Sequence, residues 1–585
     1  MRRGVLEALR DAKSPALPVL IAPTGYGKTS AVHYSWREVL REWGRVVHVL
    51  PLRALVSDVA SKAAKRGLPL DLVSYQAMLE EVKVELEGRE VRVRKSPYML
   101  SPYVAVTYDS YLLSFYVAPV AELTRAHAHR DVGLLAAAGG GVIFDEVHLA
   151  LATDALGSQA GGGGQQEPLR EEESKAFTAL VTTIELLKRY LSRPVVAMTA
   201  TLQRAAVSWL SSELERRGID THLHVCLGRR GLKYLEGAAP HITPHGLDES
   251  YSSLYERYRA VARTLVSKEP VEAEAKKALD NSRTVLVFCN TVPRAVDVYR
   301  ALKDKIGAEV RLLHGRMGEK HRESAVKEVE KLLEGGKELV LVSTQCLEAG
   351  VDLDFDTVVT EVASPGSLVQ RAGRAIRDLE RRLEQEGGPR VQVVVSINEK
   401  SVESAKAVYP GAAVNAAAKA LKVGEHFFDW RFAEEEPSFI DLLAQHDEVE
   451  PALNKSVENK LKTMLEVRTV SGEDVESLLR KLDEDMEGSL LRDSALIPLV
   501  VYDDEVRDVI PVSLDFLERR GGKVLKMENK KAVAVFENGD RRPVELRRLL
   551  ETPLSTLYSL RRKVEADFLG LLVREDAYDP EVGLA

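Results

Sequence analysis

Short apolar runs rich in β-branched residues alternate with helix-like segments through the first two thirds of the chain. In the N-terminal part these runs cover residues 19–22, 46–50, 104–107, 142–144 and 195–198. The pattern then restarts, with runs at 285–289, 310–313, 339–343, 357–360 and 391–397. Runs without polar alternation predict fully buried strands, and strands separated by helices predict a parallel sheet covered on both faces. We therefore expect an α/β protein with two tandem parallel-sheet domains.

The same patterns divide the chain into four segments. The two sets of strands assign residues 1–230 to a first domain and 282–400 to a second. Residues 231–281 between them are polar, contain Pro and Tyr, and predict an interdomain connection or insertion. Helical patterns dominate 401–585, so we expect a mainly helical C-terminal accessory domain with one small β-hairpin, formed by 523–527 and 532–536. A length of 585 residues fits several domains, because single cores stop growing near ~250–300 residues.

Composition and charge exclude several classes of protein. With 81 Lys+Arg against 89 Asp+Glu, the formal net charge of −8 excludes a globally basic nucleic-acid binder but not a local basic groove. Three cysteines without a CxxC pair argue against a zinc finger or a disulfide scaffold. An apolar stretch of ~20 residues is absent and the first residues are charged, so we expect no membrane span and a cytoplasmic protein. Few cysteines with many Glu, Lys and Arg favour a thermophile.

The first apolar run leads into a glycine-containing loop, in the sequence VLIAPTGYGKTSA at 19–31. Backbone N–H groups of such a loop, together with the N-terminus of the following helix, form a cradle for phosphate. Lys28 reaches the outer phosphates and the Thr29 hydroxyl ligates Mg²⁺. The alternative is a glycine-rich turn with a chance GKT. The residues expected to bind ATP here are Thr24, Gly25, Tyr26, Gly27, Lys28, Thr29 and Ser30.

Two adjacent carboxylates end the apolar run at 142–144, in the sequence VIFDEVH. Strand ends of a parallel sheet lie on the same edge as the phosphate loop, so we expect both carboxylates beside the phosphates. Asp145 is predicted to hold Mg²⁺ with Thr29, and Glu146 to orient and deprotonate the attacking water. The alternative is that these acids only cap a helix.

Three arginines follow at a spacing of three residues in QRAGRAIR, at 370–377. A surface face of ion pairs is the usual explanation for such a run. Here the run belongs to the second α/β domain, and phosphoryl transfer needs positive charge on the developing γ-phosphate. An arginine that reaches across from a second domain also makes hydrolysis depend on domain closure.

These motifs, in this order, resemble superfamily 2 helicases, over about residues 19–400. The remaining motifs of that superfamily match at 51–55 (PLRAL), 106–109 (VTYD), 199–201 (TAT), 287–291 (VFCNT), 313–316 (LHGR) and 343–352 (STQCLEAGVD). DEVH at 145–148 places the chain in the DExH group. The resemblance implies two RecA-like domains with ATP between them. No glutamine precedes Gln76, so the adenine-reading glutamine of DEAD-box proteins is missing and base specificity stays open.

The resemblance also implies roles for individual residues. Arg374 and Arg377 are expected as arginine fingers, Gln370 as a γ-phosphate sensor and Asp352 as a ribose contact. His148, Thr199 and Thr201 are expected to couple the ATP site to the rest of the motor. Thr107 and Thr344 have the alternative role of simply ending strands. Residues expected to follow a nucleic-acid backbone are Arg53, Thr107, Asn290, His314, Gly315 and Thr344.

More closely, PTGYGKT, DEVH and QRAGRAIR are similar to the helicase subunit of type I CRISPR interference. That family implies a 3′–5′ translocase on single-stranded DNA that acts with the Cascade effector complex and its guide RNA. An HD nuclease domain often precedes the helicase in this family. Here His446-Asp447 lacks further ligands and is interpreted as a loop, as are the pairs His127/His129 and His222/His224. We therefore expect the split form, as in type I-A systems, with the HD nuclease on a separate subunit.

Two other functions stay open at this point. The first is a DExH helicase of RNA processing or DNA repair, which would use the same motor on another substrate. The second is a non-catalytic helicase fold that serves as a scaffold in an interference complex. The intact Lys28, Glu146 and Arg374 argue against the scaffold.

Overall fold

The first domain is a ten-stranded sheet with helices on both faces. The computed structural model describes residues 2–76, 82–86, 88–119, 130–148, 171–348, 353–375, 379, 390–445, 453–466, 472–490, 495–503 and 505–584. The strand order is β10-β9-β1-β8-β7-β2-β6-β3-β5-β4, parallel except for the β4–β5 hairpin. The strands are β1 (Leu17–Ile21), β2 (Val46–Leu50), β3 (Val73–Gln76), β4 (Val82–Leu86), β5 (Arg89–Lys95), β6 (Tyr103–Thr107), β7 (Gly141–Phe144), β8 (Val195–Thr199), β9 (Thr221–Val225) and β10 (His241–Pro244).

The helices of this domain follow the strands, as the alternating pattern predicted. They are α1 (Arg3–Asp11), α2 (Lys28–Tyr34), α3 (Trp36–Trp43), α4 (Arg53–Lys65), α5 (Tyr108–Tyr116), α7 (Arg130–Ala138), α9 (Glu171–Glu185), α10 (Arg204–Arg216) and α11 (Arg229–Leu235). Strands β1, β2, β6, β7 and β8 are buried at every position, because helices cover both faces. The five strands predicted for this part of the chain are therefore confirmed.

The second domain contains a seven-stranded sheet in the order β13-β14-β12-β15-β16-β11-β17, with only β17 antiparallel. Its strands are β11 (Ala262–Ser267), β12 (Thr284–Phe288), β13 (Glu309–Leu313), β14 (Leu339–Ser343), β15 (Thr357–Glu361), β16 (Arg390–Ser396) and β17 (Gly424–His426). Its helices are α12 (Glu249–Val261), α13 (Val271–Leu279), α14 (Val292–Leu302), α15 (Glu319–Glu334), α16 (Pro365–Ala372), α18 (Glu399–Lys406), α19 (Gly411–Ala420) and α20 (Phe439–Ala444). The five strands predicted for this domain are all present.

Two parts of this sheet come from outside the range 282–400 that was expected for the domain. Strand β11 belongs to the range expected as a connection, and it pairs with β16. Strand β17 lies beyond residue 400 and pairs with β11 as the edge of the sheet. The second domain therefore takes up residues on both sides of its predicted bounds.

The C-terminal region combines helices with a six-stranded sheet in the order β19-β18-β23-β21-β20, and β22 pairs with β21. Its elements are α21 (Lys455–Glu466), α22 (Gly472–Met486), β18 (Leu496–Asp503), β19 (Glu505–Ser513), α23 (Leu514–Val524), β20 (Met527–Glu528), β21 (Lys531–Phe536), β22 (Arg541–Val544), α24 (Leu546–Glu551), α25 (Pro553–Val564) and β23 (Phe568–Leu572). The predicted hairpin is present as β20–β21. It is one part of a larger sheet that the mainly helical expectation did not include.

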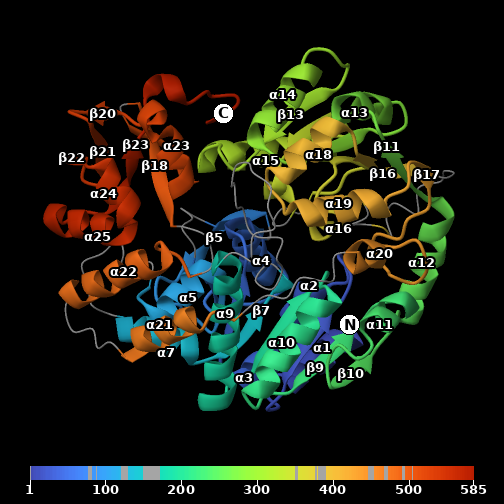
Figure 1. Cartoon of the computed structure of the whole chain (residues 1–585), viewed down its shortest axis with the longest axis horizontal. Helices are drawn as coiled ribbons and strands as arrows, with labels where there is room; N and C mark the ends of the chain where they lie inside the picture. The colour runs from blue at the N-terminus through green and yellow to red at the C-terminus, as the bar shows by residue number, and fades with distance from the viewer. Residues whose placement is uncertain are drawn as a thin grey trace.

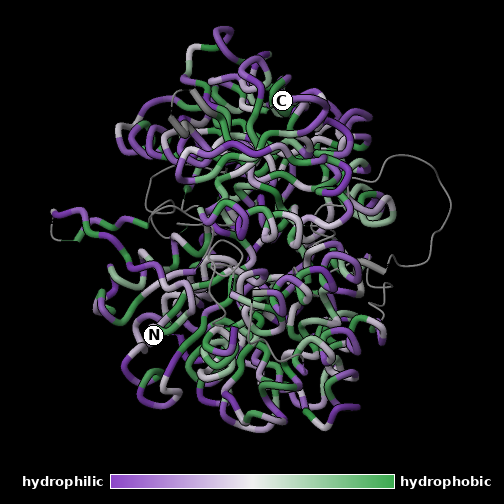
Figure 2. The backbone as a smooth tube through the Cα atoms, turned by 90° about the vertical axis from the view of Figure 1, so that its left-hand side faces the viewer, coloured by the Kyte–Doolittle hydropathy of each residue, from purple (hydrophilic) through white to green (hydrophobic). Residues whose placement is uncertain are grey.

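The three parts form a lower lobe, an upper lobe and a C-terminal region beside both (Figure 1). Hydrophobic segments run through the interior, and hydrophilic segments lie mostly at the periphery (Figure 2). Helix α21 packs on α9 of the first domain, and β19 packs on α15 of the second. None of the helices in the described ranges is both long and apolar enough to cross a membrane.

Candidate active site between the two domains

The phosphate loop joins the fully buried strand β1 to helix α2, which begins at Lys28. Gly25 and Gly27 have φ angles of 70° and 91°, in the left-handed region that favours glycine. The Lys28 side chain is buried, and its Nζ donates a hydrogen bond 3.1 Å long to the Ala22 carbonyl. The loop residues Thr24 to Ser30 all line a cleft of about 1260 Å³ between the domains. The loop N–H groups and the Lys28 ammonium thus lie at the cleft, and their binding of phosphate stays a prediction.

The two predicted Mg²⁺ ligands lie together. The Thr29 hydroxyl donates to Oδ2 of Asp145 over 3.3 Å. Oδ2 of Asp145 also lies 3.0 Å from Nε2 of His48, whose Nδ1 lies 2.7 Å from the Tyr103 hydroxyl. One hydroxyl and one carboxylate oxygen at the phosphate loop are hard oxygen donors, the type that Mg²⁺ binds alongside substrate phosphates. The donor set therefore fits the expected ion.

His48 is a positioning residue that the sequence analysis missed. It stands in the middle of the buried strand β2 and has no exposed surface. Its imidazole connects Asp145 to the buried Tyr103 hydroxyl and so restricts the orientation of the carboxylate. A lone histidine within the apolar run VVHVL was the available signal, since a polar group in a buried strand needs a partner.

Glu146 lies beside Asp145 on a strained backbone, with a φ angle of 51°. Its Oε2 is 3.3 Å from Nδ1 of His148, and the same Nδ1 lies 2.9 Å from the Thr199 hydroxyl. Burial alone would raise the pKa of Glu146, but nearby Lys28 and His148 outweigh burial and lower that pKa below the ordinary value. The carboxylate is therefore ionised at neutral pH, as a base must be before it accepts a proton.

The three residues expected to couple the motor form one chain of contacts. His148 contacts the Thr199 hydroxyl, and that hydroxyl donates to the Thr201 carbonyl over 2.9 Å. His148 and Thr201 also face Gln370 of the second domain across a small cavity that the three residues line. A movement of Gln370 would therefore change the surroundings of His148, which contacts Glu146.

The second domain presents Gln370 and Arg374 to the same cleft as the phosphate loop. The two domains approach each other closely here, since a Cβ atom added at Gly373 of the second domain would lie 3.3 Å from Oγ1 of Thr24 in the phosphate loop. Within the described residues, Nε2 of Gln370 is buried and has no hydrogen-bond partner. A buried donor without a partner is costly unless a ligand supplies the acceptor. This donor fits a phosphate oxygen in the cleft.

The arginines of the same segment differ in their surroundings. Arg374 lines the cleft and its Nη2 donates to the Glu348 carbonyl over 2.8 Å. Arg371 has no exposed surface, and its guanidinium donates to Glu348, Thr360 and Tyr409. Arg371 therefore holds the second domain together, while Arg374 faces the cleft. Arg377 and Asp352, expected as a second finger and a ribose contact, lie outside the described residues.

Three of the expected nucleic-acid contacts lie near the ends of their elements. Arg53 begins α4 and forms an ion pair of 3.0 Å with Glu319, the first residue of α15 in the second domain. The Thr107 side chain caps helix α5, accepting from the Ser110 N–H. Thr344 follows β14 and is almost fully buried. For Thr107 the alternative of a strand-ending cap describes what the structure shows.

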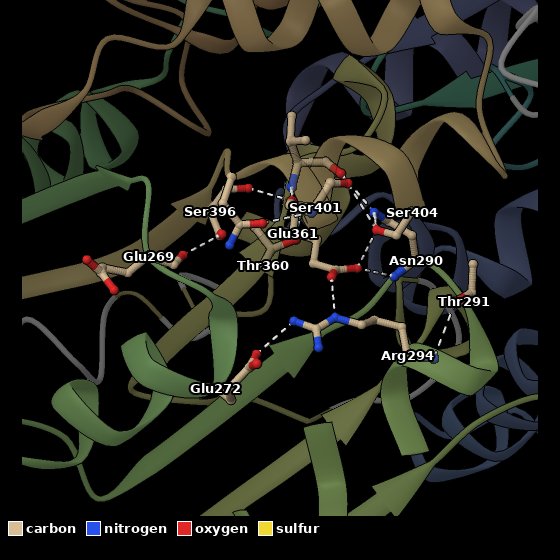
Figure 3. Close-up of polar contacts among 12 residues, drawn as sticks. Glu269, Glu272, Asn290, Thr291, Arg294, Thr360, Glu361, Ser396, Ser401 and Ser404 are labelled. Carbon is tan, nitrogen blue, oxygen red and sulfur yellow. Dashed lines mark hydrogen bonds and ion pairs between the residues drawn. The ribbon is translucent and has the colours of Figure 1, made fainter. Parts of the chain in front are cut away.

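Asn290 is buried inside the second domain (Figure 3). Its amide nitrogen donates to the Val362 carbonyl and to the Ser404 hydroxyl, each over 3.0 Å, and its backbone N–H donates to Glu361. Glu361 in turn accepts from Arg294 over 2.9 Å. This network commits the Asn290 side chain to packing of the domain, so its predicted contact with nucleic acid stays a prediction.

His314 and Gly315 lie under the C-terminal segment. Nε2 of His314 is 2.9 Å from the Val582 carbonyl, and a Cβ atom at Gly583 would lie 2.7 Å from the Arg316 carbonyl. Burial lowers the pKa of His314 to about 4, so its imidazole is neutral at pH 7. The predicted roles of His314 and Gly315 in nucleic-acid binding also stay predictions.

Family models match both domains of the chain. The model described as DEAD/DEAH box helicase matches residues 6–208, and the one described as CRISPR-associated nuclease/helicase Cas3, C-terminal, matches 281–380. A solved structure, the crystal structure of T. fusca Cas3, has a TM-score of 0.55 at 16% identity. It covers 97% of this chain, and this chain covers 67% of it.

Curated relatives point the same way. The CRISPR-associated nuclease/helicase Cas3 of Methanothermobacter thermautotrophicus is 24% identical over 386 residues, or 64% of this chain and 40% of the relative. The CRISPR-associated endonuclease/helicase Cas3 of Thermus thermophilus is 26% identical over 470 residues, or 67% and 46% respectively. The chain thus spans less than half the length of these relatives.

Fold, site and matches define a superfamily 2 helicase of the DExH group, a class of nucleic-acid-dependent ATPases with two RecA-like domains. Within that class the chain is similar to Cas3-type helicases.

Proposed function

We propose that this chain is the ATP- and Mg²⁺-dependent motor of a type I CRISPR interference system in the cytoplasm. It would move 3′ to 5′ on single-stranded DNA and act with a separate HD nuclease subunit and the guide-RNA-containing Cascade complex. One observation carries the ATPase part of the proposal. The cleft brings the phosphate loop, the two carboxylates of DEVH, Gln370 and Arg374 together from two domains.

Each residue of the cleft has a definite chemical task in this proposal. Lys28 and the loop N–H groups bind the phosphates, and Thr29 and Asp145 would hold Mg²⁺, which neutralises phosphate charge when bound. Glu146, ionised and beside the metal ligands, orients the attacking water and accepts its proton. Arg374 stabilises charge on the transferred phosphoryl group from the opposite domain. Hydrolysis then requires both domains to face the nucleotide at once.

Relatives support the CRISPR part of the proposal. Those from M. thermautotrophicus and T. thermophilus are described as nuclease/helicase and endonuclease/helicase Cas3. A CRISPR RNA-guided surveillance complex in a pre-nicking state contains a chain with a TM-score of 0.50 to this one. The pairs His446-Asp447 and His127/His129, which were predicted to be parts of loops, lie outside the described residues.

The test measures ATP turnover of the purified chain alone, with single-stranded DNA and with single-stranded RNA. We expect stimulation by DNA, and further stimulation by target DNA bound to the guide-RNA complex. Displacement of streptavidin from a biotinylated 5′ end, but not from a 3′ end, would establish 3′–5′ movement. Stimulation by RNA alone would favour an RNA-processing helicase and contradict the proposal. Turnover that does not exceed that of Glu146→Gln under any condition would favour the non-catalytic scaffold.

A further inference from the structure

A cluster of histidines and carboxylates lies at the edge of the first sheet, outside the residues that line the ATP cleft. It consists of Asp11 at the end of α1, His222 and His224 on β9, His245 after β10, and Glu7 on α1. Two overlapping groups of three have ligand atoms within 4.8 Å of one another: Asp11 with His222 and His224, and Glu7 with His224 and His245.

The local fold explains why these side chains converge. Residues two apart on a strand point to the same face, so His222 and His224 lie side by side, with ring centroids 4.4 Å apart. Helix α1 packs on this strand and ends at Asp11. Strand β10 pairs in parallel with β9, and its last residue precedes His245 by one position. The loop predicted for His222 and His224 is wrong, because both residues lie on strand β9, where the fold also brings Asp11, Glu7 and His245.

The distances within the first triad match those around a small cation. Oδ2 of Asp11 lies 3.1 Å from Nδ1 of His222 and 3.0 Å from Nε2 of His224. Ligand atoms at about 2.0–2.1 Å from a tetrahedral Zn²⁺ are separated by roughly 3.3 Å. Small side-chain movements would therefore place all three atoms on one ion. The side chains of Asp11 and His222 are 39% and 27% exposed, so an ion can reach them from solvent.

Outer partners fix the imidazoles in a suitable orientation. Nε2 of His222 lies 2.7 Å from the Thr243 hydroxyl, so an N–H there leaves Nδ1 as a lone-pair donor facing Asp11. Nδ1 of His224 lies 3.1 Å from Nε2 of His245, so an N–H there leaves Nε2 of His224 free in the same way. Nδ1 of His245 approaches Glu7 at 3.9 Å. Metal-binding histidines usually have such a partner on the second nitrogen.

We propose that Asp11, His222 and His224 form a site for a zinc-like divalent cation, with water in the fourth position. Two imidazole nitrogens and one carboxylate oxygen favour Zn²⁺ over Mg²⁺ or Ca²⁺, which prefer oxygen ligands alone. The ion links helix α1 to strand β9, next to the edge strand β10, so it stabilises the N-terminal side of the first domain. This site is separate from the ATP cleft and does not depend on the proposed function.

The experiment uses the full chain, first dialysed against a chelator and then against metal-free buffer. Calorimetric titration with ZnCl₂ and elemental analysis after desalting measure stoichiometry and affinity, and thermal denaturation measures stabilisation. We expect one Zn²⁺ per chain, a higher melting temperature with Zn²⁺, and no such increase with MgCl₂. Removing the outer partner in His245→Ala should weaken binding roughly 10–100-fold, and His222→Ala or Asp11→Asn should weaken it further.

The matched control is His241→Ala. His241 lies opposite His222 in the β9–β10 register but outside both groups of three. This variant should bind Zn²⁺ as the unaltered chain does. Circular dichroism of each metal-free variant separates loss of the site from loss of fold. Absence of binding at micromolar Zn²⁺ would overturn the proposal. The cluster would then be only a carboxylate that is hydrogen-bonded to two histidines. Binding that survives in a His222→Ala/His224→Ala double variant would also overturn it.

Discussion

Glu146 shows how a single side chain is prepared for its task. It has a positive φ angle that a glutamate adopts only when its surroundings impose it, and its pKa is lowered by Lys28 and His148 against the effect of burial. The neighbouring Asp145 is held by Thr29 and His48 instead. Two adjacent carboxylates thus have different partners, which supports separate roles as base and metal ligand.

We predict that Glu146→Gln lowers ATP turnover about 10²–10⁴-fold, the usual contribution of a general base. Nucleotide binding should persist, because Lys28 and the loop N–H groups are unchanged. Turnover by phosphate release and affinity by a fluorescent nucleotide analogue measure the two effects. Glu328→Gln, on an exposed part of α15, serves as the control and should retain full turnover. Unchanged turnover in Glu146→Gln would refute the assigned base.

We predict opposite kinds of defect for two arginines three residues apart. Arg374→Ala should lower turnover about 10³-fold or more, as removal of an arginine finger does, with little change in melting temperature. Arg371→Ala should destabilise the second domain by about 3–5 kcal/mol, because it leaves Glu348 without its buried partner. Phosphate release and thermal denaturation separate them. Equal loss of stability in both variants would contradict the assignment.

At this scale the ATP-site residues were predictable, but the nucleic-acid contacts were less so. Lys28, Thr29, Asp145 and Glu146 lie at strand ends or at a helix start, where their spacing along the chain implies their position. Asn290 follows a strand in the same way, yet its amide bonds within the second domain. A spacing cannot show whether a polar group faces the cleft or a neighbouring element, since that depends on contacts such as Ser404, distant in sequence.

Among the elements, strands formed by apolar runs were predictable, including the edge strand β13, whereas strands with interrupted apolar sequence, such as β3, β9 and β11, were not. All ten predicted strands are fully or largely buried in the two parallel sheets, because continuous apolar runs occur where both faces are covered. The unpredicted β10 has an exposed pattern, and β17 has only three residues. The C-terminal sheet was missed apart from its hairpin, since its other strands are interrupted by Pro or Gly, contain charged residues or are very short.

Asp483 is an example of a helix cap supplied by another element. It lies on α22, and its carboxylate accepts from the backbone N–H groups of Leu554 and Ser555 in the first turn of α25, over 3.0 and 2.8 Å. Burial raises the pKa of Asp483 to about 6. Because this value is still below 7, the carboxylate is ionised at neutral pH and can accept both hydrogen bonds. No local sequence signal reveals such a cap.

We predict that Asp483→Ala destabilises the C-terminal region by about 1–2 kcal/mol, the usual cost of losing a helix cap. Hydrogen exchange at the amides of α25 should report the loss most directly. The control is Asp485→Ala, on the same helix, whose exposed ion pair with Lys460 should contribute less than about 1 kcal/mol. Equal exchange rates in the two variants would show that the cap is dispensable.

Across the whole molecule, the C-terminal region contacts both motor domains. Asp508 of β19 accepts from the backbone N–H groups of Lys320 and His321, at the start of α15. Arg130 of the first domain donates to the Met464 carbonyl of α21 over 2.6 Å. The Arg53–Glu319 ion pair lies next to the first of these contacts and joins the two motor domains directly.

We predict that Glu319→Gln increases affinity for single-stranded DNA, because a phosphate no longer competes with Glu319 for Arg53. The change should be largest at low salt, where phosphate contacts are strongest. Arg53→Ala should weaken binding, and Glu319→Gln should have no further effect in that background. Fluorescence anisotropy of a labelled oligonucleotide measures all three, with Glu328→Gln as the control. An increase in the absence of Arg53 would show that the pair does not restrain binding.

Residues just beyond the last helicase motif also belong to the motor. Strand β17 completes the second sheet. Farther along, the Arg431 guanidinium donates to the Gly25 carbonyl of the phosphate loop over 3.3 Å, and Tyr251 of the earlier helix α12 donates to the same carbonyl over 3.0 Å. A chain truncated at the end of the motif region would keep every helicase motif. It would lose the edge strand β17 and the Arg431 hydrogen bond to the phosphate loop. The motor therefore extends at least to Arg431, and motif boundaries underestimate the unit that evolution can move between proteins.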